Sequence, residues 1–435
     1  MSADPFHLAW FAADGFGVKS WGKTFSGRGG QDWADPALWI DLAQALERAR
    51  FDFIIIEDSS YMPDTYGGTS EAYLKTATAT PKMDPSVLAP LMSHATKKIG
   101  IVPTMSVSEH HPYGLARTIN TLDHMSQGRT GWNIVTGSND NAAKNYGLDD
   151  WLEHDERYDM ADEFFDLACR LWTSWEEDAV VLDEATGTWG DFTKVHTVDF
   201  QGTYFSSRGP LNAPQSPQGL PTFVQAGGSP RGKKFDARAA NAIISGVEGG
   251  PAKMKAFRDD IRAQAALAGR SPDDVKVLYL ISPIIAETDE EAWAKRRRQT
   301  EFAEAHPEIG LLHLSRHSRI DFSQWDLDEV IPEGTTTNGH RQQLEQCIGK
   351  TPRQILREGF GQGNFEIVGS PDTVAAQLDE AMEEVGGDGF LIASRDLNRR
   401  YISEIADGLV PALQRRGVVR EEYSHDTFRD NLLAF

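Results

Sequence analysis

The chain contains few cysteines and has a deficit of basic residues. Only two cysteines, Cys169 and Cys347, occur among its 435 residues, and they lie in separate segments without metal-like spacing. We therefore expect buried thiols in a reducing compartment rather than a disulfide framework. Lysine and arginine number 43 against 65 acidic residues, which gives a net charge of -22. This balance argues against a nucleic-acid partner, which would require a basic stripe.

Signals for export and for membrane insertion are also missing. No apolar run approaches the length of about eighteen residues that a transmembrane helix requires. The first 20 residues include Asp4, Asp14 and Lys19 and contain no uninterrupted apolar stretch, so a secretory signal is not expected. We predict a cytoplasmic protein that has no membrane partner.

Several catalytic motifs are absent. The chain has no H-E-x-x-H, EF-hand, Walker, G-x-G-x-x-G or G-x-S-x-G element, so nothing in it supports a metal site or nucleoside-triphosphate chemistry. The adjacent His110 and His111 point in different directions and cannot chelate one metal together. We expect one of them to face a cavity and the other to stabilise its loop.

Short apolar runs alternate with amphipathic helical patterns through most of the chain. Strands are predicted at 6–12, 51–57, 99–105, 130–136, 221–226, 241–246, 275–285 and 388–394, and helices at 37–50, 113–125, 156–172, 252–267, 370–385 and 400–416. Strands that are apolar on both faces, eight in number, predict an α/β fold of the (β/α)8 TIM-barrel type with insertions. We expect one domain over 1–435, with insertions at about 174–220 and, as a lid, at about 301–365.

The carboxyl ends of the strands are where barrel enzymes build their active sites. The polar residues near these ends are Asp14, Asp58, Thr104, Ser106, Asn133 and Thr136. After the fifth strand comes AGGSPRGKKF, in which Ser229 suits a helix N-cap and Pro230 the first helical position. Two glycines and the open helix start would suit a phosphate, with Arg231 nearby. A capped helix that binds nothing is an equal alternative.

A second helix start lies in LEHDERY, where His154, Arg157 and Tyr158 have the i, i+3, i+4 spacing of one helix face. Such a face can grip an anion or a cofactor. The alternative is a solvated helix start whose acidic residues favour the positive end of the helix dipole.

Three long segments resemble the bacterial-luciferase-like flavin monooxygenases. They begin EHHPYGLARTINTLDHM at 109, NYGLDDWLEHDERYDMA at 145 and KVHTVDFQGTYF at 194. The chain is most similar to the group that includes nitrilotriacetate, dibenzothiophene-sulfone and long-chain-alkane monooxygenases. This resemblance implies a luciferase-like barrel, assembled as a homodimer or tetramer, that binds reduced FMN supplied by a separate NAD(P)H:flavin reductase.

The resemblance also implies roles for individual residues. The FMN-binding residues would be Asp58, Thr104, His154, Tyr158 and Ser229, the last three at the phosphate end. Asn133 would face the isoalloxazine or the substrate, and Asp14, His110 and His111 would be nearest to the reaction. The implied reaction uses O2 and reduced FMN to oxygenate a small organic substrate at carbon, nitrogen or sulfur. A deazaflavin-dependent reductase of the same fold and a non-catalytic flavin-binding barrel remain as alternatives.

The chain departs from the alkane-oxidising members, which carry a cysteine near the end of the first strand. No cysteine precedes Cys169 here, so a substrate role for that thiol does not transfer. The predicted lid contains LLHLSRHSRIDFSQ, with His313, Arg316 and His317 as candidate substrate-binding residues. Its charge favours an anionic substrate, although a solvated lid surface explains it equally well. Arg157 is expected to form a structural ion pair.

Overall fold

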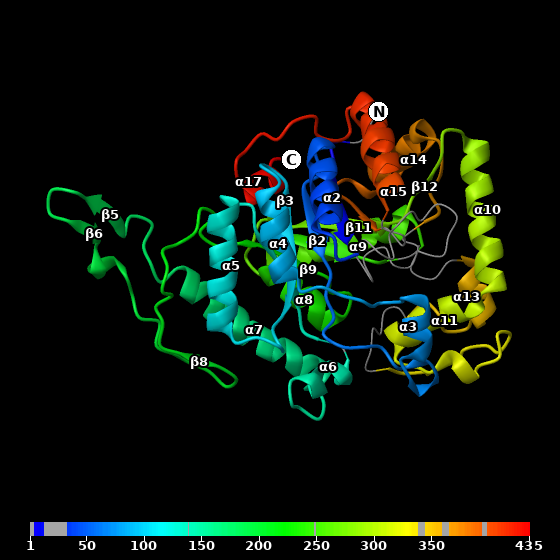
Figure 1. Cartoon of the computed structure of the whole chain (residues 1–435), viewed down its shortest axis with the longest axis horizontal. Coiled ribbons are helices and arrows are strands. Elements are labelled where there is room, and N and C mark those ends of the chain that lie inside the picture. Colours follow the sequence, from blue (N-terminus) through cyan, green and yellow to red (C-terminus); the bar gives the residue numbers. More distant parts are fainter. Residues whose placement is uncertain are drawn as a thin grey trace.

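A closed barrel of eight parallel strands forms the centre of the computed structural model (Figure 1). The structure describes residues 4–12, 33–137, 139–247, 249–337, 344–358, 365–393 and 398–435. Around the barrel the strands follow the order β1 (His7–Ala12), β2 (Phe53–Ile56), β3 (Gly100–Ser106), β4 (Gly131–Val135), β9 (Thr222–Gln225), β10 (Ala242–Ser245), β11 (Lys276–Ile281) and β14 (Gly389–Ala393). Each lies within a predicted strand or extends it by one residue. The predicted TIM barrel is confirmed.

Side chains along each strand alternate between two apolar environments. Val102 and Leu278 belong to the cluster inside the barrel, whereas Trp132 and Phe223 pack outwards against the helices. Because successive strand residues point to opposite faces, both faces must be apolar when helices cover the outside. This double burial explains the continuous apolar runs of the sequence.

The helices cover the barrel from outside. Those predicted from the sequence are α2 (Pro36–Arg48), α5 (Pro112–Ser126), α7 (His154–Trp172), α8 (Pro230–Ala239), α9 (Pro251–Leu267) and α14 (Pro371–Val385). The predicted helix 400–416 is divided into α15 (Arg399–Ser403), a π-helical turn (Glu404–Leu409) and α16 (Val410–Arg416). Helices not predicted are α3 (Glu71–Thr76), α4 (Pro85–His94), α6 (Asp140–Asn145), α10 (Asp289–Ala305), α11 (Pro307–Ser318), α13 (Pro352–Glu358) and α17 (Phe428–Leu432). None of the described helices is long and apolar enough to span a bilayer.

The predicted strand at 275–285 was wrong in one respect. The barrel strand β11 ends at Ile281, and β12 (Ile284–Ile285) pairs instead with β13 (Val368–Gly369) outside the barrel. Pro283 separates the two pieces and cannot donate a ladder hydrogen bond, so the barrel strand cannot continue through it.

A hairpin arm within 174–220 projects from one end of the molecule, far from the barrel (Figure 1). Its strands β5 (Val180–Asp183) and β6 (Thr188–Gly190) pair in antiparallel fashion, and β7 (Phe200–Gln201) pairs with β8 (Ser206–Ser207) closer to the barrel. Leu182, Trp189 and Phe192 of the arm are 65%, 54% and 86% exposed. Exposed apolar side chains clustered on one projection are typical of a protein contact surface.

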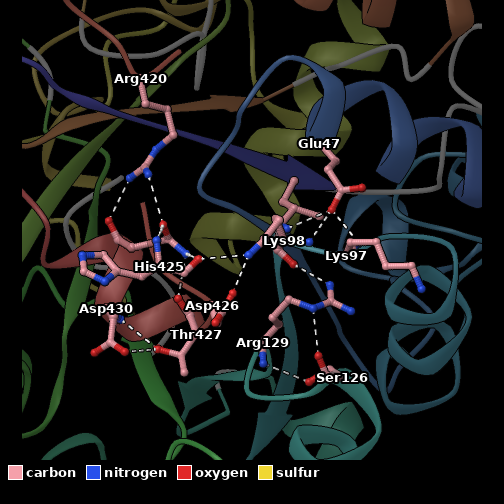
Figure 2. Close-up of polar contacts among 12 residues, drawn as sticks. Glu47, Lys97, Lys98, Ser126, Arg129, Arg420, His425, Asp426, Thr427 and Asp430 are labelled. Atoms are coloured by element: carbon pink, nitrogen blue, oxygen red, sulfur yellow. Dashed lines mark hydrogen bonds and ion pairs between the residues drawn. The ribbon is translucent and has the colours of Figure 1, made fainter. Parts of the chain in front are cut away.

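The amino ends of the strands are closed by a network of polar contacts (Figure 2). The Glu47 carboxylate accepts the backbone N–H groups of Lys97 and Lys98 at 2.6 and 2.5 Å. The Arg129 guanidinium donates to the carbonyl oxygens of Ser126 and Ile99 at 2.8 and 3.0 Å. In α17, Phe428 packs against Phe53 inside the barrel, with ring centroids 5.2 Å apart. This end of the barrel is therefore filled, which leaves the carboxyl ends of the strands for a site.

Candidate active site

The first turns of α7 and α8 meet beyond the carboxyl end of β9. Ser229 is the N-cap of α8, as predicted, and its Oγ accepts the Gly232 N–H at 3.0 Å. A Cβ atom on Gly232 would lie 2.9 Å from the Tyr158 hydroxyl and 3.1 Å from Ser229 Oγ. The two hydroxyls, which are 71 residues apart in sequence (229 minus 158), thus converge on one helix start.

His154 lies beside this pair. It is the first residue of α7, and its ring centroid is 5.3 Å from that of Tyr158. The Nδ1 atom of His154 is 2.6 Å from an Asp155 carboxylate oxygen. Arg157, the third residue of the predicted face, donates instead to the Leu152 carbonyl at 2.7 Å. The structure brings His154, Tyr158 and Ser229 together, whereas Arg157 supports the preceding loop.

The Tyr158 hydroxyl stays protonated at neutral pH. Burial, reinforced by the nearby Asp236 carboxyl, raises the pKa of Tyr158 to about 12, although a side-chain hydrogen bond with Gln225 opposes the shift. Arg231 lies over the Tyr158 ring at 5.5 Å and forms ion pairs with Asp159 and Asp162 at 2.9 and 2.5 Å. Its guanidinium is therefore tied to α7 by two carboxylates. The hydrogen-bond donors of this site are the hydroxyls and the helix start.

A second pair of polar residues lies inside the barrel. Thr104 of β3 and Asn133 of β4 are register partners, and the Asn133 amide nitrogen donates to Thr104 Oγ1 at 2.8 Å. Both are about 95% buried, with 3% and 5% of their surfaces exposed. No hydrogen-bond donor for Asn133 Oδ1 is present among the described residues. A buried amide oxygen without a donor is suited to accept a hydrogen bond from a ligand.

Acidic groups gather where the loops after β2 and β3 meet. Ser60 Oγ donates to the Glu109 carboxylate at 2.7 Å, and the Tyr146 hydroxyl donates to the same group at 3.3 Å. Burial, followed by the repulsion of Glu109, raises the pKa of Asp58 to about 7. Asp58 can therefore exchange a proton close to neutral pH.

The two adjacent histidines have different surroundings. His111 is the exposed N-cap of α5, where Nδ1 accepts the Tyr113 N–H at 3.2 Å. His110 is half-buried, and its Nδ1 lies 2.9 Å from the Ser106 carbonyl at the end of β3. His111 stabilises the start of a helix, as expected for one member of the pair, and His110 is the member nearer to the strand ends. Asp14 lies outside the described residues.

The predicted lid residues lie on α11, which packs on the β2 side of the barrel mouth. Arg316 is buried, and its guanidinium lies 3.5 Å from a Glu57 carboxylate oxygen and 3.4 Å from Ser59 Oγ. His317 Nδ1 is 2.8 Å from the His313 carbonyl. The next cation, Arg319, forms an ion pair with Asp140. Both arginines thus have carboxylate neighbours, which offset the cationic character that the sequence suggested.

Sequence reasoning missed three groups at the site. Gln225 ends β9, and the rule that selected polar residues at strand ends also applies to it. Glu109 is part of the histidine loop, but its contacts with Ser60 and Tyr146 come from distant segments. Asp236 is fully buried in α8, and no local pattern marks it.

The residues at the site come from adjacent strands of the barrel. Asp58, Thr104, Asn133 and Ser229 lie in or after β2, β3, β4 and β9, which are consecutive neighbours in the sheet. The carboxyl ends of parallel strands meet at one rim, so these groups share one mouth of the barrel. Hydroxyls and a helix start thus lie on the β9 side of this mouth. A buried amide and ionisable carboxylates lie on the side of β4, β3 and β2.

Comparison with known proteins identifies relatives along almost the full chain. Residues 16–389 match the luciferase-like monooxygenase family. A dibenzothiophene-sulfone monooxygenase of Rhodococcus erythropolis is 35% identical, over 98% of this chain and 96% of that protein. Component A of the nitrilotriacetate monooxygenase of Aminobacter aminovorans is 34% identical, over 92% and 90%. The structure of a riboflavin lyase with modified FMN and riboflavin has a TM-score of 0.90 and 31% identity, covering 99% and 96% of the two chains. The chain belongs to the luciferase-like monooxygenase family, and the predicted enzyme class, a flavin-dependent monooxygenase, is confirmed.

Proposed function

We propose that this flavin-dependent monooxygenase uses reduced FMN, rather than another flavin, together with O2 to oxygenate a small organic substrate. The observation that carries the proposal is the convergence of Tyr158 and Ser229 on the first turn of α8. Neutral hydroxyls at a helix N-terminus bind a phosphate through hydrogen bonds and the helix dipole. FMN differs from riboflavin by this phosphate, so such a site favours FMN over riboflavin.

The residues present fit the two ends of FMN. Gly232 lets the Tyr158 and Ser229 hydroxyls approach the start of α8 closely, which a side chain at 232 would prevent, and this pair of hydroxyls suits the phosphate. The unsatisfied Asn133 Oδ1 inside the barrel suits a ring N–H. We assign His154, Tyr158 and Ser229 to the phosphate end, and Thr104 and Asn133 to the ring. When bound, reduced FMN supplies the two electrons that, with O2, place one oxygen atom on the substrate and release the other as water.

The chain's own residues would position the reactants and control protons and water. Asp58, with Glu109 near it, can hold or release a proton near pH 7 as water forms, and His110 lies at the end of the neighbouring strand β3. Arg316 of α11 reaches Glu57 and Ser59 at the end of β2, so it fixes the lid to the barrel. A lid held in this way would exclude bulk water from the reaction. We propose His313 and His317 as the lid groups nearest to the substrate.

A separate NAD(P)H:flavin reductase is proposed as the source of reduced FMN. The support is the relative named as component A of a monooxygenase, since a component implies a second protein. Because such a reductase draws on the NAD(P)H pool, we expect both proteins to act in the cytoplasm.

We also propose a homodimer or tetramer in which the hairpin arm contacts a second copy of the chain. Trp189 and Phe192 of the arm are largely exposed. Replacing both with serine should lower the mass measured by analytical ultracentrifugation. Leu267→Ser, at an isolated residue that is 88% exposed, is the matched control. An unchanged mass in the arm variant would rule out this contact.

Oxygen uptake separates the main proposal from a deazaflavin reductase and from a flavin-binding barrel without activity. The protein is supplied with NADH, FMN and a flavin reductase, and candidate sulfones, sulfides and amino-polycarboxylates are added in turn. A productive substrate should increase oxygenated product while hydrogen peroxide release falls. Tight FMN binding without product from any candidate would favour the binding barrel, and reduction of substrate by a deazaflavin would favour the reductase.

A further inference from the structure

A fully buried acid lies beneath the proposed phosphate site. Asp236 belongs to α8, two turns after the Ser229 cap, and has 0% of its surface exposed. No side chain of the described residues hydrogen-bonds to either carboxyl oxygen, and the nearby Gly227 N–H is only a weak partner. Burying an ionised carboxylate costs roughly several kcal/mol of folding free energy unless it is paired with a cation. The group therefore needs an explanation that the barrel's packing does not supply.

Asp236 touches the glycine turn that leads into α8. A methyl group on Gly227 would overlap the Asp236 carboxyl group, so the turn passes directly against it. The acid also lies close enough to Tyr158 to influence its titration. Gln225 Oε1, another buried oxygen without a partner among the described residues, belongs to the side chain that hydrogen-bonds with Tyr158. Asp236 thus packs against the glycine turn that leads into the proposed phosphate site and acts electrostatically on the Tyr158 hydroxyl.

The charged and titratable groups around Asp236 do not neutralise it. Lys233, on the same helix, is the cation that acts on Asp236, and Tyr158 on α7 is the other titratable group near it. Arg157 and Arg231 act on Tyr158, and Asp260 on α9 pairs with Lys233. Lys233 is bonded to Asp260 at 2.7 Å, and Arg231 to Asp159 and Asp162. Burial raises the pKa of Asp236 well above its usual value, against the weaker effects of the Gly227 N–H and Lys233. A fully buried carboxyl group without an ion pair favours its uncharged, protonated form.

We propose that Asp236 is a positioning residue of the phosphate site that supports the glycine turn as an uncharged acid, so that binding of the FMN phosphate requires a proton at Asp236. This inference rests on the proposed function. Loss of the proton would place a negative charge under the turn, and this charge would repel the phosphate dianion. By linkage, the bound phosphate would in turn hold the proton more tightly.

The test measures the equilibrium binding of oxidised FMN and of riboflavin between pH 7.5 and 9.5. Quenching of the flavin fluorescence reports the bound fraction. The phosphate itself is almost fully ionised across this range, since its second pKa is about 6. The Tyr158 hydroxyl, with its pKa at about 12, also stays constant. For the wild type we expect FMN to bind at least about fivefold more weakly at pH 9.5, and riboflavin to change less than about twofold.

Asp236→Asn keeps the shape of the uncharged acid and cannot ionise. It should bind FMN at pH 7.5 within about threefold of the wild type and show no weakening at pH 9.5. The matched control is Asp162→Asn, which removes a carboxylate already paired with Arg231 and Arg238, so that its FMN affinity should keep the wild-type pH dependence.

Three results would overturn the inference: an FMN affinity of the wild type that does not depend on pH, equal pH dependence for FMN and riboflavin, or wild-type pH dependence in Asp236→Asn. An FMN affinity of the wild type that does not change with pH would overturn the inference even if the variant does not fold. If the wild type fails to bind FMN at pH 7.5, the proposed function itself fails, whereas tight but pH-independent binding removes only the role of Asp236.

Discussion

Removing the Tyr158 hydroxyl should weaken FMN binding while leaving riboflavin binding unchanged. Tyr158 is 7% exposed, and its hydroxyl shares the start of α8 with Ser229. A hydrogen bond to a charged phosphate contributes about 1–3 kcal/mol. Since about 1.4 kcal/mol corresponds to a tenfold change, Tyr158→Phe should weaken FMN binding by roughly 5- to 150-fold. Fluorescence titration of both flavins at pH 7.5 measures the effect.

Ser229→Ala should have a similar effect on FMN and should also lower stability by about 1 kcal/mol, because Ser229 caps α8. Ser370→Ala is the matched control: Ser370 caps α14 through the Thr373 N–H and also precedes a proline, but it lies outside the proposed site. The Ser370→Ala variant should lose a similar free energy of unfolding and keep the FMN affinity of the wild type. Unchanged FMN affinity in both site variants, or an equal loss of riboflavin affinity, would refute the phosphate assignment.

Three further predictions concern other parts of the structure. Because the pKa of Asp58 is raised from 3.8 to about 7, its protonated form favours the folded state, and this stability is present below about pH 4 and is lost as the pH rises to about 7. Asp58→Asn should therefore raise the melting temperature relative to wild type more at pH 8 than at pH 5, and an equal gain at both pH values would contradict the raised pKa. Asn133→Ala should weaken FMN and riboflavin equally, by about fivefold, and a loss confined to FMN would contradict its placement at the ring. Asp52, paired with His7 and Arg420, has a lowered pKa despite burial, so its contribution to stability is present at neutral pH and lost in acid. Asp52→Ala should cost about 3–5 kcal/mol in denaturant unfolding at pH 7, and a cost below about 1 kcal/mol would contradict a buried charge network.

The barrel was predictable because its strands carry a strong local signal. Burial on both faces produces apolar runs such as FDFIIIE, and each run is followed by an amphipathic helix or a loop. The helix α10 was missed for the opposite reason: only Ala292 among its residues is buried, so no apolar stripe marks it. The sequence therefore indicates elements that face the core and is silent about helices that lie mostly in solvent.

The candidate site was predictable only in part. The Ser229 cap follows from a local pattern, and the structure shows it as expected. The position of Tyr158 beside that cap depends on how α7 and α8 pack, so the sequence indicated it only through resemblance to a family. Asp236 and Glu109 could not be selected, because burial and the approach of distant chain segments determine their chemistry.

With reduced FMN as the electron source, the chain is proposed to transfer one oxygen atom from O2 to a substrate. Mass spectrometry of the product formed under 18O2, with NADH, a flavin reductase and FMN, tests it most directly. We predict one 18O atom in each product molecule and none from 18O-labelled water under unlabelled O2, with activity lost when riboflavin replaces FMN. Product oxygen that comes from water, or turnover that continues without O2, would contradict the assignment.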